Sequence, residues 1–223
     1  GGEYKGCQHQ YDSSVGFDQL NYVIDLIKNN PTSRRIIINL WNPKTLHKAT
    51  LPSCLCKYQF YVDTTHKELN LQIYLRSSDF FLANNWNTCT GALLVHLLCN
   101  LHDIDLTPGI LTVVVGDTHL YKNHIEQVRK NLERVPYPFP KLIIKNQKNN
   151  IEDFVWKDLQ IIGYKSYPRI PAPMAVWENF NNFNYFQCIL VFFNLVFNYV
   201  FNSIYLKIII FVIIIYKSWV PID

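Results

Sequence analysis

The sequence lacks the features that mark zinc ribbons and disulfide-rich proteins. Its 223 residues include six cysteines, and no two of them form a Cys-x-x-Cys pair. So few scattered cysteines cannot form a disulfide scaffold, and we expect reduced thiols, a cytoplasmic location and no metal. The cysteines stand at positions 7, 54, 56, 89, 99 and 188.

Concentrated charge is also missing. The net charge is +4, only 17% of the residues are charged, and the lysines and arginines are spread along the chain. A nucleic-acid-binding protein needs a basic stripe, so we predict no DNA partner, whereas small anionic ligands remain candidates. With 49% hydrophobic residues, the chain is not intrinsically disordered.

The composition changes after Val176, so residues 1–176 and 177–223 are treated as two segments. The second segment, the tail, holds eight of the fourteen phenylalanines, and residues 179–206 carry no charge. Residues 208–216 are an unbroken run of Ile, Phe, Val and Tyr. Three interpretations stay open: read-through of AT-rich non-coding sequence, a membrane segment, or an additional packed element.

Residues 1–176 alternate between helix and strand patterns, which favours an α+β domain with a mixed β-sheet packed against helices. Apolar positions predict helices up to Asn29 and over 87–101. Predicted strands cover 36–40, 56–62, 69–75, 110–115 and 141–145, and the second and third of these form a candidate hairpin.

Cys54 is the residue with the clearest chemical interpretation. It follows Leu51-Pro52-Ser53 at the entrance to a predicted strand, in a chain whose arginines include Arg76. A nearby cation lowers a thiol's pKa and makes it nucleophilic. A lone cysteine is more often a small buried hydrophobe, so spacing alone leaves both interpretations open.

Nine segments together resemble thymidylate synthase, in the family's order and at nearly its spacing. They are Gly16-Phe17-Asp18-Gln19-Leu20, Arg34-Arg35-Ile36-Ile37, Trp41-Asn42-Pro43, Leu51-Pro52-Ser53-Cys54, Gln59-Phe60-Tyr61-Val62, Gln72-Ile73-Tyr74-Leu75-Arg76-Ser77-Ser78-Asp79, Gly116-Asp117-Thr118-His119-Leu120-Tyr121, Asn123-His124 and Pro138-Phe139-Pro140-Lys141-Leu142. The resemblance implies reductive methylation of dUMP to dTMP, with 5,10-methylenetetrahydrofolate as cosubstrate and dihydrofolate as the second product.

The resemblance also implies the site residues. The catalytic positions are Cys54, the nucleophile toward C6 of the pyrimidine, with Arg76 and Asp79. The dUMP-binding positions are Arg34, Arg35, Gln59, Arg76, Ser77, Asp79, Asn87, His119 and Tyr121. The folate-binding positions are Asp79, Trp86 and Ala175.

Two of these assignments carry further expectations. An amide at Asn87 both donates and accepts hydrogen bonds, which favours uracil over cytosine. Arg34 and Arg35 match residues that reach the other subunit's phosphate site, so the resemblance implies a homodimer.

The sequence departs from the family in several places. The resemblance starts at Gly2 and covers roughly the C-terminal three-fifths of the family domain, which implies that the fold is incomplete at the N-terminus. Leu55, Ala83 and Asn85-Trp86 differ from the usual residues, and the tail follows the usual end at Val176. The alternative interpretation is therefore an inactive truncated fragment or a mis-predicted gene product, membrane-associated through its tail.

Overall fold

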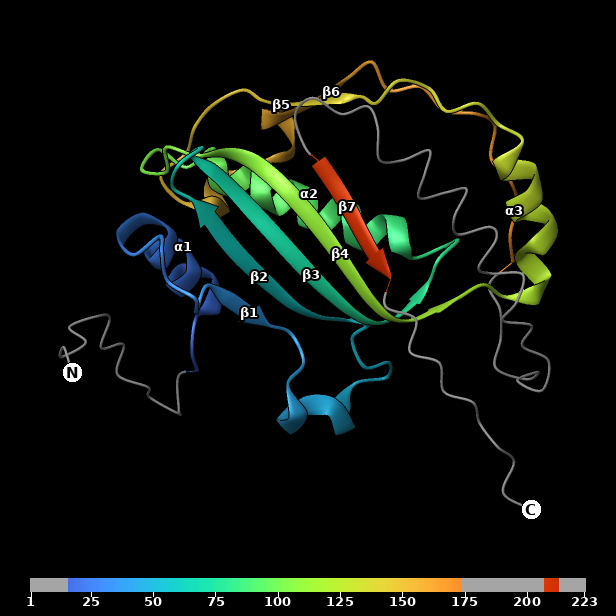
Figure 1. Cartoon of the computed structure of the whole chain (residues 1–223), viewed down its shortest axis with the longest axis horizontal. Coiled ribbons are helices and arrows are strands. Elements are labelled where there is room, and N and C mark those ends of the chain that lie inside the picture. The colour runs from blue at the N-terminus through green and yellow to red at the C-terminus, as the bar shows by residue number, and fades with distance from the viewer. Residues whose placement is uncertain (1–15, 174–206, 213–223) are drawn as a thin grey trace.

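A mixed β-sheet forms the centre of the protein. The computed structural model describes residues 16–173 and 207–212, and its main sheet has the strand order β1-β2-β3-β4-β7 (Figure 1). Strands β1, β2 and β3 are antiparallel neighbours, whereas β3, β4 and β7 run parallel. The strands are β1 (Ile37–Asn39), β2 (Leu55–Asp63), β3 (Glu68–Asp79), β4 (Thr107–His119) and β7 (Lys207–Val212).

The remaining elements are helices and a small second sheet. The α-helices are α1 (Gln19–Asn29), α2 (Asn84–Cys99) and α3 (Ile125–Leu132), and β5 (Lys141–Ile144) pairs with β6 (Leu159–Ile162). Short 3-10 helices cover Pro43–Lys48, Lys122–His124, Ile151–Asp153 and Trp156–Asp158. The α+β fold class is thus confirmed.

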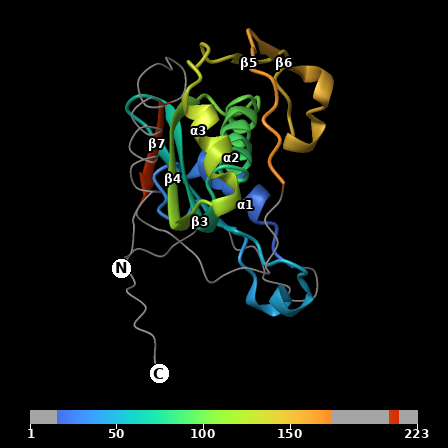
Figure 2. The same ribbon diagram turned by 90° about the vertical axis from the view of Figure 1, so that its right-hand side faces the viewer.

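The core lies between one face of the sheet and the helices α1 and α2, which share one side in Figure 2. Every second side chain of β3 is buried, from Leu69 through Leu71 and Ile73 to Leu75. This alternation follows from the two-residue repeat of a strand. Helix α2 connects β3 to the parallel β4, because parallel neighbours require a crossover.

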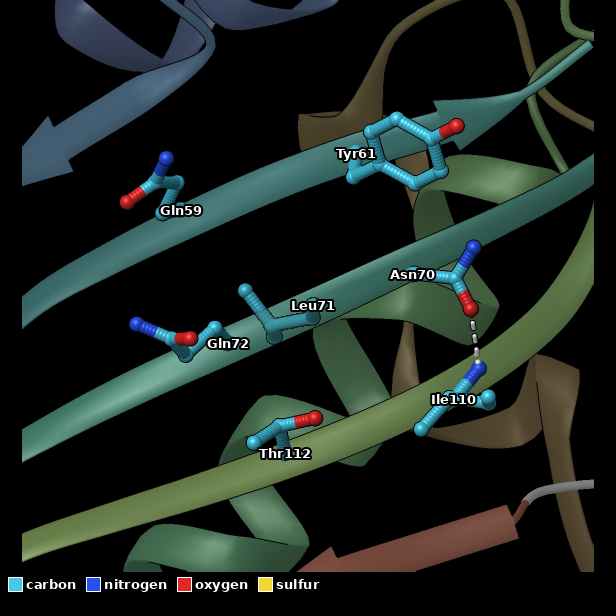
Figure 3. Close-up of a pocket in the computed structure, with 7 residues that line it drawn as sticks. All are labelled: Gln59, Tyr61, Asn70, Leu71, Gln72, Ile110 and Thr112. Atoms are coloured by element: carbon cyan, nitrogen blue, oxygen red, sulfur yellow. Dashed lines mark hydrogen bonds between the residues drawn. The ribbon is translucent and has the colours of Figure 1, made fainter. Parts of the chain in front are cut away.

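The other face of the sheet carries polar and aromatic side chains and faces the viewer in Figure 1, where no described helix crosses it. Tyr61 on β2 is 66% exposed. A shallow cavity of about 210 Å³ lies on this face (Figure 3). Its lining residues are Gln59, Tyr61, Asn70, Leu71, Gln72, Ile110 and Thr112. We call this surface the open face.

Most predicted elements are present with shifted ends. The 69–75 strand extends to Asp79, and the helix predicted over 87–101 begins at Asn84. The β2–β3 hairpin is confirmed, and Asp63 organises its turn by accepting hydrogen bonds from the backbone N–H groups of Thr65 and His66.

Most of the tail lies outside the described residues. Its described part is β7, whose backbone pairs with residues 110–115 of β4. Among the described residues, no helix combines the length and the apolar character that a membrane crossing requires. Read-through and membrane association remain predictions.

Asp18 begins α1 by accepting hydrogen bonds from the backbone and side-chain nitrogens of Asn21, at 2.9 and 2.8 Å. The backbone hydrogen bond is the main cause that lowers the pKa of Asp18 from 3.8. We expect Asp18→Ala to reduce the free energy of unfolding by about 1 kcal/mol at pH 7. Because the folded-state pKa is lowered, this difference persists above pH 3.8 and shrinks as the pH falls through the folded-state value.

Urea denaturation of both proteins at pH 7 and pH 2.5 measures that difference. Asp18→Asn is the matched control, since it keeps a capping oxygen without the charge. An effect of Asp18→Ala that is equally large at both pH values would contradict the assignment of an ionised cap.

Candidate active site

Cys54 lies half-buried directly before β2. Its carbonyl oxygen accepts a hydrogen bond of 2.9 Å from the backbone N–H of Arg76 on β3. The β2–β3 register shifts between Leu55 and Lys57, so the strand has an extra residue at Cys56, beside the predicted nucleophile. Leu55, which departs from the family pattern, packs against the core.

The Arg76 side chain holds the loop that leads to Cys54. Its Nε donates to the carbonyl oxygen of Ser53 at 2.9 Å, and its Nη2 donates to that of Pro52 at 2.8 Å. A guanidinium has five N–H donors in a fixed plane. Two of them fix the loop, so three remain for an anionic ligand.

Three segments meet at one edge of the sheet. The start of antiparallel β2 lies beside the end of β3, because Leu55 is paired with Leu75. The end of parallel β4 lies on the other side of β3, with Ser77 opposite Asp117 and Asp79 opposite His119. Cys54, Arg76, Ser77, Asp79 and His119 are therefore brought to the same edge.

Gly116 allows β4 to approach Arg76 closely. A Cβ at this position would lie 2.9 Å from the carbonyl oxygen of Arg76 and 3.1 Å from the hydroxyl of Tyr74. We expect Gly116→Ala to lower the free energy of unfolding by about 1–3 kcal/mol, since the backbone must shift to admit the methyl group.

Thermal and urea denaturation measure the effect of Gly116→Ala. Gly91→Ala is the matched control, because its closest contact is 3.3 Å to a side-chain atom of Ile73, and alanine favours the helix. Equal stability of Gly116→Ala and the wild type would contradict the close approach of the two strands.

His119 and Tyr121 form an edge-to-face pair at the end of β4, with ring centroids 5.1 Å apart. Burial is the main cause that raises the pKa of Tyr121, and the negative charges of Asp79, Asp117 and Cys54 raise it further. The Nδ1 atom of His119 is buried, has no hydrogen-bond partner among the described residues, and lies 3.7 Å from the Asp117 carboxylate.

The loop between β3 and α2 places the other predicted ligands. Asp79 accepts hydrogen bonds from the backbone N–H groups of Phe81 and Leu82, both at 3.1 Å, so this carboxylate shapes the loop. The Asn87 amide lies in the first turn of α2 and donates to the carbonyl oxygen of Ala83 at 3.4 Å. Trp86 precedes it and is 77% exposed.

The structure does not bring every predicted residue to this edge. Arg34 and Arg35 are exposed and lie near Phe60 of β2, whose N–H bonds to the carbonyl oxygen of Ile36. Gln59 lines the open face (Figure 3). Ala175 lies outside the described residues. No cluster of His, Cys, Asp and Glu suited to a metal ion occurs within residues 16–173.

His124 is a site neighbour to which the sequence analysis gave no role. It is fully buried, its Nε2 lies 2.7 Å from the carbonyl oxygen of Pro173, and its ring packs against Tyr121 and Phe81. Asn123-His124 was among the segments of resemblance, but its contact with residue 173 is too distant in sequence for spacing to reveal.

Comparisons with known proteins cover the same segment. The family model described as thymidylate synthase matches residues 2–176. A bifunctional dihydrofolate reductase-thymidylate synthase of Paramecium tetraurelia is 43% identical over 176 residues, which are 79% of this chain and 37% of that protein. The thymidylate synthase of Homo sapiens is 44% identical over 176 residues, 55% of its length.

The chain is shorter than the relatives it matches. It is 40% identical to the bifunctional dihydrofolate reductase-thymidylate synthase of Leishmania major and spans 33% of that protein. It spans 37% of the Paramecium tetraurelia protein and 55% of the human one. The match nevertheless covers all the site residues described above. The chain belongs to the thymidylate synthase family.

Proposed function

We propose that this site binds dUMP and carries out its reductive methylation to dTMP. The observation that supports this most is the gathering of a cysteine, an arginine, an aspartate, a histidine and a tyrosine at one sheet edge, in a chain of this family. The five residues are Cys54, Arg76, Asp79, His119 and Tyr121.

Cys54 acts as the nucleophile. Its thiolate forms a bond to C6 of the pyrimidine, the electron pair of the 5,6 double bond moves toward C5 and O4, and C5 becomes nucleophilic. C5 forms a bond to the methylene carbon of the folate cosubstrate and loses its proton, and the folate nitrogen then leaves that carbon. Hydride transfer from the tetrahydrofolate to the carbon forms the methyl group, the thiolate leaves C6, and the 5,6 double bond is restored with dihydrofolate as the second product. The hydrogen bond between Arg76 and the Cys54 carbonyl oxygen fixes the backbone from which the thiol attacks.

The other residues hold the nucleotide. Arg76 and Ser77 bind the phosphate, because a planar guanidinium presents paired donors that match phosphate oxygens. His119 and Tyr121, whose rings pair at the end of β4, bind the ribose hydroxyl. Asn87 binds the pyrimidine edge.

A folate cosubstrate, 5,10-methylenetetrahydrofolate, supplies the one-carbon unit and the reducing equivalents. Asp79, Trp86 and Ala175 are the residues that we assign to its binding. The exposed indole of Trp86, beside the proposed pyrimidine contact Asn87, fits a flat aromatic ligand.

Protection of Cys54 from alkylation tests nucleotide binding directly. We expect dUMP to slow the labelling of Cys54 by iodoacetamide and to leave the exposed Cys89 unaffected. Burial raises the pKa of Cys99 to about 12, so this thiol stays protonated and serves as an unlabelled reference. Labelling of Cys54 that dUMP does not change would contradict the proposed function.

We further propose that the site is shared in a homodimer formed through the open face. Arg34 and Arg35 lie near Phe60, about 20 Å along β2 from Cys54, at a strand rise of about 3.3 Å per residue. They are thus too far from Cys54 of their own chain for one phosphate, which supports a role in the partner's site.

Disruption of the open face tests the homodimer. We expect Tyr61→Arg to convert the protein from dimer to monomer in light scattering, because it places a charge in the middle of the interface. Tyr164→Arg is the matched control, since Tyr164 is equally exposed but lies outside the main sheet. A wild-type monomer, or a dimeric Tyr61→Arg protein, would contradict this proposal.

A further inference from the structure

Trp41 lies next to Arg76 although the two residues come from different parts of the fold. It follows β1, and four hydrogen bonds fix the backbone of residues 39–41. Its backbone N–H donates to the side-chain oxygen of Asn39 at 3.1 Å. Gln19 bonds both backbone groups of Asn39, at 2.7 and 3.0 Å. The N–H of Leu40 donates to the carbonyl oxygen of Cys56 at 2.8 Å.

The Trp41 ring faces the guanidinium of Arg76, whose central carbon lies 5.4 Å from the ring centroid. This distance is within the range of a cation–π interaction, and tryptophan is the strongest aromatic partner for one. The same guanidinium uses two of its edge donors on the carbonyl oxygens of Pro52 and Ser53. The indole of Trp41 thus contacts the Arg76 guanidinium, while the two hydrogen bonds to Pro52 and Ser53 fix the edge of that guanidinium.

We propose that Trp41 is a positioning residue for the proposed phosphate site, an inference that rests on the proposed function. The ring holds the guanidinium plane of Arg76 so that two donors stay on the loop before Cys54 and the others point to a phosphate. One aromatic side chain thereby sets both the phosphate donors and the loop that carries the nucleophile.

Titration calorimetry with dUMP and with deoxyuridine tests this role. We expect Trp41→Leu to weaken dUMP binding about threefold to tenfold. Trp41→Phe should recover most of the affinity, because a phenyl ring preserves the cation–π contact. Deoxyuridine lacks the phosphate, so its affinity should not change in either variant.

A double-mutant cycle separates positioning from general damage. If Trp41 acts through Arg76, Trp41→Leu should have little effect on dUMP affinity in an Arg76→Ala background. Trp156→Leu is the matched control, because Trp156 is 81% exposed and lies outside the site. Equal dUMP affinities of the wild type and Trp41→Leu, or additive effects of the two substitutions, would overturn the proposal.

Amide hydrogen exchange decides the inference independently of any ligand. We expect the peptide covering residues 51–56 to exchange faster in Trp41→Leu and in Arg76→Ala than in the wild type and in Trp41→Phe. Should the wild type bind no dUMP, the proposed function fails, and this exchange pattern alone then decides whether Trp41 holds Arg76. Unchanged exchange in Trp41→Leu would overturn the inference.

Discussion

Cys54→Ser should abolish the exchange of the C5 hydrogen of dUMP with solvent, which follows from reversible thiolate addition to C6. A serine hydroxyl is far less ionised at neutral pH than a thiol, so the rate should fall by at least about 10³-fold. Release of tritium from [5-³H]dUMP measures the effect, and dUMP binding shows that the variant is folded.

Cys56→Ser is the matched control for Cys54→Ser. Cys56 occupies the extra position of the same strand, and its thiol lies 3.7 Å from the carbonyl oxygen of Cys54. Its replacement should leave the exchange rate close to that of the wild type. A Cys54→Ser protein with the wild-type rate would contradict the assignment of the nucleophile. A wild-type chain that binds dUMP but exchanges no hydrogen would instead favour the inactive fragment.

Leu111→Ala should lower the stability of the protein more than Asp18→Ala or Gly116→Ala. Leu111 is fully buried on β4, between the sheet and α2, where one of its methyl groups would lie 3.5 Å from a Cβ added at Gly91. The lost burial and the remaining cavity should lower the free energy of unfolding by about 2–5 kcal/mol.

Urea denaturation at constant protein concentration measures the effect of Leu111→Ala. Val135→Ala is the control, since Val135 is 75% exposed and its replacement should change stability by less than about 0.5 kcal/mol. A Leu111→Ala protein as stable as the control would show that the packing of α2 on β4 is loose.

The strands of the main sheet were predicted better from the sequence than helix α3 and strand β6, which lie outside that sheet. In β3 fully buried apolar residues alternate with more accessible polar or aromatic ones from Leu69 to Leu75, a period of two that is typical of a strand. Helix α3 was not predicted, although Ile125, Val128 and Leu132 have the spacing of one helix face, because the helix has only eight residues and these three are its only apolar ones. Strand β6 was not predicted. Only Leu159 of this strand is even half-buried, so its four residues have no alternation of buried and exposed side chains.

For the candidate site, the sequence indicated single residues but not the contacts between them. Cys54, Arg76 and His119 could be proposed as site residues from the sequence, because they stand in continuous segments of resemblance. Contacts between residues that are far apart in the sequence could not be predicted from the spacing of the motifs. Trp41 and Arg76, for example, meet only because β1 and β3 flank β2 in the sheet. The position of Gln59 on the open face also required the strand register.

The β2–β3 hairpin has a consequence for the order in which the site assembles during folding. Its turn spans only residues 64–67, so β2 and β3 can pair outward from a short loop until Cys54 and Arg76, at the far end of the hairpin, meet. His119 and Tyr121 join this pair only after α2 has crossed the sheet and β4 has paired with β3. Since short loops close at lower entropic cost, we expect the nucleophile and its arginine to meet early. The histidine and the tyrosine should complete the site in a later step.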